Sequence, residues 1–218
     1  MKQMGAGLIV IAALLTASSG GLVGDPKHPR HLIYLHGRIV QEQQSARPKH
    51  PQFGTYELEK ILDAFRKRGF VVSGEIRPKS ASPRDAADHV VEQMRQLLQS
   101  GVDADHITVV GASMGAEIAL LASARLQNPG VRFCVLGACL SETVSRLGAE
   151  EGKAPRGRIL AIREASDDLG GPCAPWKDLP SGSALFAREI VLHTGLRHGF
   201  LYRPLPEWVD PTAEWATR

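Results

Sequence analysis

Residues 107–115 read Ile-Thr-Val-Val-Gly-Ala-Ser-Met-Gly. The stretch begins as a β-branched run, which is typical of a buried strand, and ends in a GxSxG pattern around Ser113. The serine of such a pattern is held on a sharp turn between strand and helix, and Gly111 and Gly115 leave room for neighbouring backbone. The next residues, 116–126, are rich in Ala and Leu and predict a helix. The stretch therefore predicts a strand, a turn and a helix that together present a serine nucleophile.

Strand-like runs and helical stretches alternate along the rest of the chain. Runs rich in Val, Ile or Leu predict strands at residues 31–35, 70–76, 107–110, 131–137, 158–163 and 189–193. Helices are predicted at residues 56–68, 83–100, 116–126 and 206–217, with a short one near Ser183. This alternation predicts an α/β fold with a mostly parallel sheet of about six strands and helices on both faces. Ligands of such sheets bind beyond the carboxyl ends of the strands.

Several residues mark boundaries between these elements. Ser82 followed by Pro83 is typical of an N-cap and the first position of a helix, and residues 128–130 (Asn-Pro-Gly) end the helix after Ser113. Residues 37–55 and 141–155 are the longest irregular segments. Long loops in a compact domain often carry binding function.

Length and charge narrow the possible classes of protein. The chain has 218 residues, a formal net charge of +3 and a sequence pI near 8.9. Acidic and basic residues are interleaved without a long run of either sign, which argues against nucleic-acid binding. We expect residues 21–218 to form a single domain with a substantial core.

The first twenty residues differ in composition from the rest. Lys2 is followed by a mostly apolar run over residues 5–17 and then by small residues. This pattern is typical of a secretory signal peptide, and the run is shorter than the roughly 20 apolar residues that span a membrane. We expect residues 1–20 to be a signal peptide that is cleaved after Ser19 or Gly20. The mature protein would then be periplasmic or extracellular, without a membrane-spanning segment.

The chain has three cysteines, and export would place them in an oxidising compartment where a disulfide can form. Cys134 lies within an apolar run and is expected to be buried, whereas Cys139 and Cys173 each follow a predicted strand at the same edge of the sheet. We expect a Cys139–Cys173 disulfide, although the sequence leaves other pairings open. Neither the cysteine spacing nor the placement of the histidines is typical of a metal site, and we predict no bound metal.

A serine hydroxyl is a weak nucleophile until a base takes its proton, so Ser113 needs a histidine. The loop after the predicted strand at residues 189–193 carries His198 beside Gly199. We favour His198 over His193, because His193 ends the strand and is expected to pack there.

The histidine in turn needs a carboxylate that fixes its tautomer. Asp167 and Asp168 follow the predicted strand at residues 158–163, and one of the two is expected to be only a solvated loop charge or a helix cap. The family resemblance described below favours Asp167 over Asp168, because it places the acid a few residues beyond the strand. Glu142, after the predicted strand at residues 131–137, is the remaining candidate.

The chain resembles the small, capless α/β hydrolases of the esterase and dienelactone-hydrolase-like group. The resemblance rests on the GxSxG pattern, on the order serine, acid, histidine, and on Leu35-His36-Gly37-Arg38 after the first predicted strand; it covers nearly all of residues 31–218. It implies an α/β-hydrolase fold, here with about six strands because little chain precedes residue 31. It also implies an oxyanion hole formed by the backbone amides of Met114 and Arg38. The loop reads HGRI where many lipases and esterases have HGGG, so the sequence leaves open which of its backbone N–H groups belong to the oxyanion hole.

His36 and Arg77 are candidate substrate-binding residues with structural alternatives. A histidine like His36 more often hydrogen-bonds its own loop than acts on a substrate. Arg38 and Arg77 both follow strands and could favour an anionic substrate group. Ordinary ion pairs with neighbouring carboxylates explain both arginines equally well.

These observations predict an exported serine hydrolase that cleaves a small carboxylic ester or related acyl bond through an acyl-enzyme. Ser113 is the expected nucleophile, His198 the base and Asp167 the orienting acid. We expect no cofactor, and the oligomeric state stays open. Two alternatives remain: a non-catalytic binding protein with this fold, and an acyltransferase that uses the same three residues.

Overall fold

The computed structural model describes residues 28–138, 152–170 and 185–218. The expected signal peptide, the Cys139–Cys173 pair, Glu142 and the short helix near Ser183 lie outside the described residues.

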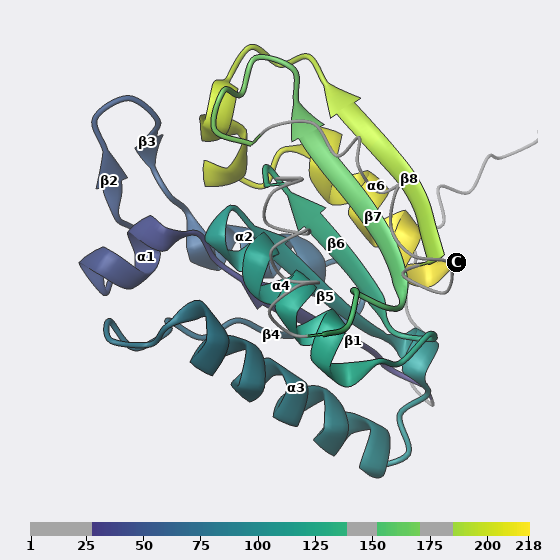
Figure 1. Cartoon of the computed structure of the whole chain (residues 1–218). Helices are drawn as coiled ribbons and strands as arrows, with labels where there is room; N and C mark the ends of the chain where they lie inside the picture. The colour runs from purple at the N-terminus through teal and green to yellow at the C-terminus, as the bar shows by residue number, and fades with distance from the viewer. Residues whose placement is uncertain (1–27, 139–151, 171–184) are drawn as a thin grey trace, which may run out of the picture.

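The centre of the fold is a six-stranded sheet in which all paired strands are parallel (Figure 1). Its order is β4-β1-β5-β6-β7-β8, and a two-stranded antiparallel hairpin, β2-β3, stands apart from it. The strands are β1 Arg30–Leu35, β2 Lys49–His50, β3 Gly54–Thr55, β4 Phe70–Ser73, β5 Ile107–Ala112, β6 Arg132–Leu136, β7 Arg158–Glu164 and β8 Leu185–Leu192. The prediction of a parallel sheet of about six strands is confirmed.

The central strand β5 is buried along its whole length. Its apolar sequence fits this position, because a central parallel strand is covered on both faces. The chain winds from β1 outward to β4 and then returns to the other side of β1 to form β5. This change of winding direction places a crevice at the carboxyl ends of β1 and β5, where open α/β sheets bind ligands.

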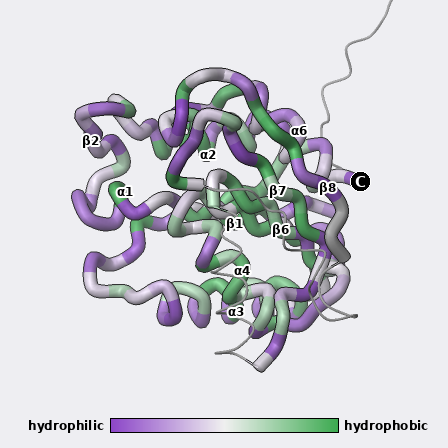
Figure 2. Tube along the Cα trace, turned by 45° about the horizontal axis from the view of Figure 1, so that its top comes forward, coloured by the Kyte–Doolittle hydropathy of each residue, from purple (hydrophilic) through white to green (hydrophobic). Residues whose placement is uncertain are grey.

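Helices cover both faces of the sheet (Figure 1). One apolar core lies beneath α3 and α4, and a second beneath α2 and α6. Figure 2 shows the hydrophobic strands enclosed by chain that is largely hydrophilic. The helices are α1 Arg38–Gln43, α2 Leu58–Arg66, α3 Pro83–Gln99, α4 Met114–Leu126 and α6 Pro206–Thr217, with 3-10 turns η1 Ala104–His106 and η3 Arg197–Tyr202.

The predicted start of α3 and the predicted end of α4 are confirmed. The Ser82 hydroxyl accepts a hydrogen bond from the Asp85 N–H, and the Asp85 carboxylate accepts one from the Ser82 N–H, so Ser82 and Asp85 form a capping box. Helix α4 ends at Leu126, and Gln127 adopts the left-handed conformation that closes a helix.

Two strands differ from their predicted bounds by more than two residues. Strand β4 ends at Ser73, because the chain turns away at Gly74, where an added Cβ would lie 2.5 Å from the Leu62 side chain. Strand β8 begins at Leu185 instead of residue 189. The charged Arg188 interrupts the apolar pattern just before residue 189, but β8 is an edge strand and Arg188 is exposed.

The segment at residues 37–55, expected to be irregular, contains the short helix α1 and the β2-β3 hairpin. Both lie at the carboxyl end of β1 and extend from the body of the sheet (Figure 1). The two-residue strands are too short for periodicity to reveal them.

Among residues 28–138, 152–170 and 185–218, no helix combines the length and the apolar composition needed to cross a membrane.

Candidate active site

Ser113 occupies the sharp turn between β5 and α4. Its backbone has φ +55° and ψ −119°, a conformation that residues other than glycine rarely adopt. The Ser113 N–H donates a 2.9 Å hydrogen bond to the Leu136 carbonyl at the end of β6. Ser113 is also the N-cap of α4, yet its side chain makes no capping hydrogen bond. The hydroxyl is therefore not engaged by the start of the helix.

The two glycines of the GxSxG pattern are required by close backbone contacts. An added Cβ on Gly111 would lie 2.2 Å from the Gly115 carbonyl oxygen. An added Cβ on Gly115 would lie 2.0 Å from the Leu35 carbonyl oxygen at the end of β1. Because these two glycines have no side chain, β1, β5 and the start of α4 can approach one another closely beside Ser113.

His198 and Asp167 come from two different loops and form a hydrogen bond. His198 lies in η3, after β8, and its Nδ1 is 2.7 Å from Oδ2 of Asp167, which follows β7. The side chains are 10% and 1% exposed, respectively. The other Asp167 oxygen, Oδ1, accepts a 3.0 Å hydrogen bond from the Leu169 N–H. With Nδ1 donating to a carboxylate, Nε2 of His198 is the nitrogen left to accept a proton.

The alternatives to these two residues are placed differently. Asp168 is exposed, and its Oδ2 accepts a 2.6 Å hydrogen bond from Nη2 of Arg197. His193 is exposed at the end of β8. Within the described part of the chain, Asp167 is the carboxylate that the structure brings to His198.

The buried residue Glu164, at the end of β7, joins the loops that carry Asp167 and His198. Its Oε1 accepts hydrogen bonds from the N–H and hydroxyl of Ser166 at 3.2 and 2.9 Å. Its Oε2 accepts two more from the N–H and hydroxyl of Thr194, both at 2.8 Å, and the Gly195 N–H lies 3.3 Å from Oε1. Burial alone would raise the pKa of this carboxyl, but the hydrogen bonds outweigh burial and lower the pKa to about 2.

Glu164 is not among the site residues predicted from the sequence, because a carboxylate after a strand is most simply interpreted there as a partner of the histidine. The sequence does hold a signal for this role of Glu164, which is a carboxylate at the end of a strand. A hydroxyl residue, Ser166, follows it in the same loop, and a second hydroxyl residue, Thr194, follows the next strand.

Ser113 and His198 line the same cleft, a cavity of about 280 Å³ at the carboxyl end of the sheet. Its other walls come from α1, the β2-β3 hairpin, the loop after β7 and η3. They are Gly37, Arg38, Ile39, Glu42, His50, Phe53, Tyr56, Ala112, Leu169, Leu201 and Tyr202. The cleft therefore combines a serine hydroxyl and an imidazole with largely apolar and aromatic walls.

The two expected oxyanion donors each begin a helix. Met114 is the first residue of α4 and Arg38 the first residue of α1. The first N–H groups of a helix have no partner within it and can bind a negative charge. The loop before α1 is close to the serine, since an added Cβ on Gly37 would lie 3.6 Å from the Ser113 Cβ.

His36 and Arg77 lie behind this loop and do not line the cleft. His36 is fully buried, with Nδ1 2.9 Å from the Gly37 carbonyl oxygen, and its Nε2 accepts a 3.1 Å hydrogen bond from the Arg77 N–H. Burial and the Arg77 charge lower the pKa of His36 to about 4. The imidazole is therefore neutral near pH 7.

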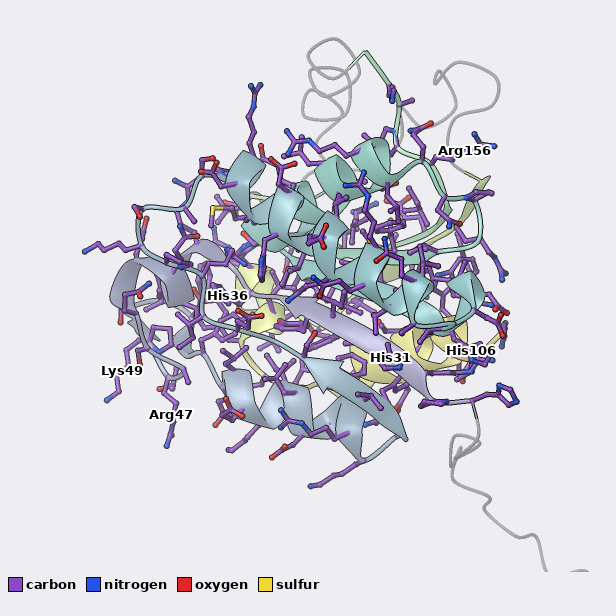
Figure 3. All side chains as sticks on the ribbon, turned by 90° about the horizontal axis from the view of Figure 1, so that it is seen from below. His31, His36, Arg47, Lys49, His106 and Arg156 are labelled. Carbon is purple, nitrogen blue, oxygen red and sulfur yellow. The ribbon has the colours of Figure 1, made fainter. Side chains whose placement is uncertain are left out.

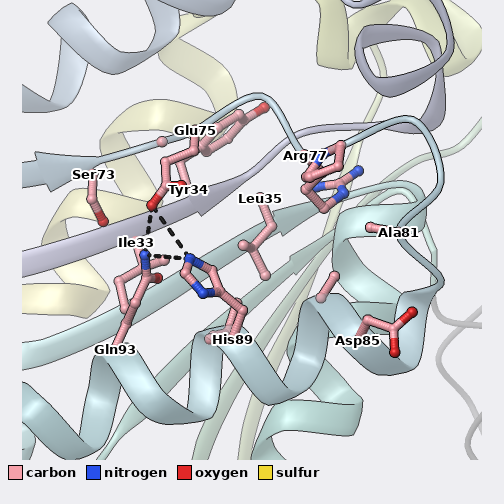
Figure 4. A pocket seen from close by; sticks show the side chains of 14 residues that line it. Ile33, Tyr34, Leu35, Ser73, Glu75, Arg77, Ala81, Asp85, His89 and Gln93 are labelled. Atoms are coloured by element: carbon pink, nitrogen blue, oxygen red, sulfur yellow. Dashed lines mark hydrogen bonds and ion pairs between the residues drawn. The ribbon is translucent and has the colours of Figure 1, made fainter.

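The Arg77 guanidinium holds the same loop. Nη2 donates a 2.6 Å hydrogen bond to the His36 carbonyl, and Nε donates a 3.1 Å bond to Oε1 of Gln41. Burial lowers the pKa of Arg77 to about 10. Arg77 lines a second cavity, of about 320 Å³, between α3 and the ends of β1 and β4; Glu75, His89 and Gln93 form a hydrogen-bonded group there (Figure 4).

In the described ranges, with their gaps at 139–151 and 171–184, no group of three or more His, Cys, Asp or Glu side chains is arranged to hold a metal ion. Cys134 is buried and unbridged, beside the hydroxyl of Thr212.

No protein-family model matches the chain, and no curated protein matches it.

The solved structures that are similar to the chain include three with TM-scores of 0.50 or more. XC6422 from Xanthomonas campestris, described as an α/β serine hydrolase without a lid, is 18% identical with a TM-score of 0.55, and the alignment covers 90% of this chain and 86% of that one. A structure from work on LipS and LipT, two metagenome-derived lipolytic enzymes, is 12% identical with a TM-score of 0.54, covering 87% and 95%. SOBER1 from Arabidopsis thaliana is 13% identical with a TM-score of 0.50, covering 87% and 98%. The chain thus has the α/β-hydrolase fold, as the sequence predicts.

Proposed function

We propose that this chain is a serine hydrolase that cleaves a carboxylic ester or a related acyl bond, with Ser113 as nucleophile, His198 as base and Asp167 as orienting acid. The observation that carries the proposal is the 2.7 Å hydrogen bond between Asp167 Oδ2 and Nδ1 of His198, which lines the same cleft as Ser113. The strained turn at Ser113 supports it, because such strain persists where the surrounding structure enforces it and is common at active sites.

In the proposed reaction, Nε2 of His198 takes the proton of the Ser113 hydroxyl as its oxygen attacks the carbonyl carbon of the ester. Asp167 stabilises the imidazolium that forms. The backbone N–H groups of Met114 and Arg38 bind the negative charge that develops on the carbonyl oxygen. His198 then gives the proton to the departing alcohol, which leaves an acyl group on Ser113. A water molecule, deprotonated by His198, releases the acid and restores the serine.

We also propose that the protein is exported through a signal peptide at residues 1–20. This rests on the composition of that segment alone. Expression of the full chain in a bacterial host followed by intact-mass measurement of the mature protein tests it. Loss of about twenty residues supports export, and a full-length mass in the periplasmic fraction contradicts the cleavage.

Hydrolysis of a graded series of chromogenic esters tests the activity. Wild type should turn over short-chain esters, and Ser113→Ala should lower kcat by roughly 10⁴-fold or more, since the removed hydroxyl is the proposed nucleophile. Ser100→Ala is the matched control, because Ser100 is an exposed C-cap whose hydroxyl bonds only the Leu97 carbonyl. Equal rates in wild type and Ser113→Ala would refute the proposal.

A further inference from the structure

The β2-β3 hairpin carries aromatic side chains into the cleft. His50 pairs with Gly54 across the hairpin, and Phe53 lies in the turn between the strands. Nδ1 of His50 accepts hydrogen bonds from the N–H groups of Gln52 and Phe53 at 3.2 and 3.3 Å. These bonds fix the orientation of the imidazole and the shape of the turn. The charged Arg47 and Lys49 of the same segment are exposed and point outward (Figure 3).

His50, Phe53 and Tyr202 form what we call the aromatic wall. The rings of His50 and Phe53 are stacked, with centroids 4.6 Å apart and an angle of 15° between their planes. The Phe53 and Tyr202 centroids are 5.5 Å apart. All three rings line the cleft, and His50 and Phe53 are only half-buried. A group in the cleft can therefore contact them.

The aromatic wall adjoins the proposed base. The Phe53 ring centroid lies 6.1 Å from that of His198, and an added Cβ on Gly199 would lie 3.3 Å from Phe53 Cδ1. A serine hydrolase delivers a proton from its histidine to the departing alcohol, so this portion of the ester lies against the side chains next to the histidine. On the α1 side of the cleft, the exposed side chains are the charged Arg38 and Glu42.

We propose that the aromatic wall binds the alcohol portion of the substrate, and that the preferred substrates are esters of aromatic alcohols. This inference rests on the proposed function and adds its substrate class. An aromatic group gains from offset or edge contacts with Phe53 and Tyr202 that an alkyl group of equal size cannot make. Phe53 is the main specificity-determining residue, since it contacts both other members of the wall and lies beside His198.

Three acetate esters with the same acyl group test the inference: benzyl, cyclohexylmethyl and ethyl acetate. Their alcohols are all primary and leave with similar intrinsic ease, which phenols would not. We expect kcat/KM for benzyl acetate to exceed that for cyclohexylmethyl acetate by about tenfold, and that for ethyl acetate by more. Esters of a single alcohol with different acyl groups, compared in the same way, should differ less.

Variants of Phe53 test whether this side chain causes the preference for benzyl acetate. Phe53→Ala should remove the preference for benzyl over cyclohexylmethyl acetate, so that the ratio of the two kcat/KM values falls to about one. Phe53→Leu retains apolar bulk without the ring and should lose the aromatic preference while keeping the preference for large over small alcohols. Val71→Ala is the control, because Val71 is an exposed apolar residue on the edge strand β4.

Each outcome bears on one proposal or the other. The proposed role of the aromatic wall is contradicted if wild type hydrolyses all three acetates at one rate, or if the Phe53 variants retain the benzyl preference. Neither result contradicts the proposal that the protein is a hydrolase. Thermal melting of each variant separates misfolding from lost specificity, and the wild-type comparison alone stays decisive if Phe53→Ala does not fold. A wild type that hydrolyses no ester contradicts the proposed function, and the inference falls with it.

Discussion

Ser113 holds a backbone conformation that costs of the order of 1–3 kcal/mol for a residue with a side chain. The strain follows from the contacts of Gly111 and Gly115, which leave the chain between β5 and α4 no room to relax. The fold thus retains an unfavourable conformation at one residue and presents its hydroxyl to the cleft.

Replacing Ser113 measures this strain. Glycine adopts positive φ without penalty, so Ser113→Gly should be more stable than Ser113→Ala by about 1 kcal/mol, even though glycine makes the unfolded chain more flexible. Urea unfolding of the two variants checks the difference. A more stable alanine variant would contradict the strained conformation.

Asp167 and Asp168 are adjacent in sequence but should differ sharply in their effect on catalysis. Asp167 is buried against His198, so Asp167→Asn should lower kcat by at least about 100-fold by disturbing the tautomer of the imidazole. Asp168→Asn should leave kcat within about twofold, because that carboxylate is exposed and pairs with Arg197. Steady-state kinetics on one ester compares them directly, and the reverse ranking would assign the acid to Asp168.

His36 should make the stability of the fold sensitive to acid. Its pKa falls from 6.5 in the unfolded chain to about 4 in the folded one, because it is buried beside Arg77. As the pH falls, His36 therefore takes up a proton in the unfolded state before it does so in the folded state. The free energy of unfolding should fall as the pH drops from about 6.5 to 4. The full effect of this group is roughly 3 kcal/mol.

Urea unfolding at pH 7, 5 and 4 measures that dependence. His36→Gln cannot titrate, and its Oε1 can still accept from the Arg77 N–H, so its stability should change less than wild type over this range. Identical pH dependence in the two proteins would show that His36 does not carry the effect.

The loops after β7 and β8 are held together by the Glu164 carboxylate, which accepts hydrogen bonds from both. Glu164→Gln replaces one accepting oxygen with a donating NH2 group, so one loop loses its partners. We expect kcat to fall by about tenfold or more with little change in KM, because the Asp167–His198 pair is displaced while the walls of the cleft remain.

Two further measurements separate positioning from stability. In an Asp167→Asn background, Glu164→Gln should have a much smaller effect on kcat, since residues that act through one another are not additive. Glu189→Gln is the control, because Glu189 contacts Arg163 across the same two strands. If Glu164→Gln lowers only the melting temperature, or lowers kcat equally in both backgrounds, Glu164 has no positioning role.

The elements that sequence could predict are those with strong local signals. The β-branched run before Ser113, the Ala-rich helix after it and the Ser82 cap each specify their structure within a few residues. The β2-β3 hairpin has no such signal, because its two-residue strands depend on packing against Tyr202 and Gly199. Residues 37–55 could therefore be identified as a functional loop but not as a folded wall of the cleft.

The whole molecule gathers its reactive side chains at one edge of the sheet. The loops after β1, β5 and β8 meet around the cleft, and the loop after β7 supplies Asp167. Chain order and strand ends were enough to predict that Ser113, Asp167 and His198 belong to one region. Glu164 could not be predicted in the same way, since its hydrogen bonds depend on the side-by-side packing of β7 and β8.

The most direct test of the central claim is covalent labelling of the whole folded protein with a fluorophosphonate, located by mass spectrometry of the digested chain. A serine activated by a neighbouring histidine attacks phosphorus, whereas an ordinary hydroxyl does not. Wild type should carry one phosphonyl group, on Ser113, while Ser113→Ala and His198→Ala should stay unlabelled and Asp168→Asn should label like wild type. A folded wild type without the adduct, or with the adduct on another serine, would contradict the assignment of Ser113 as an activated nucleophile.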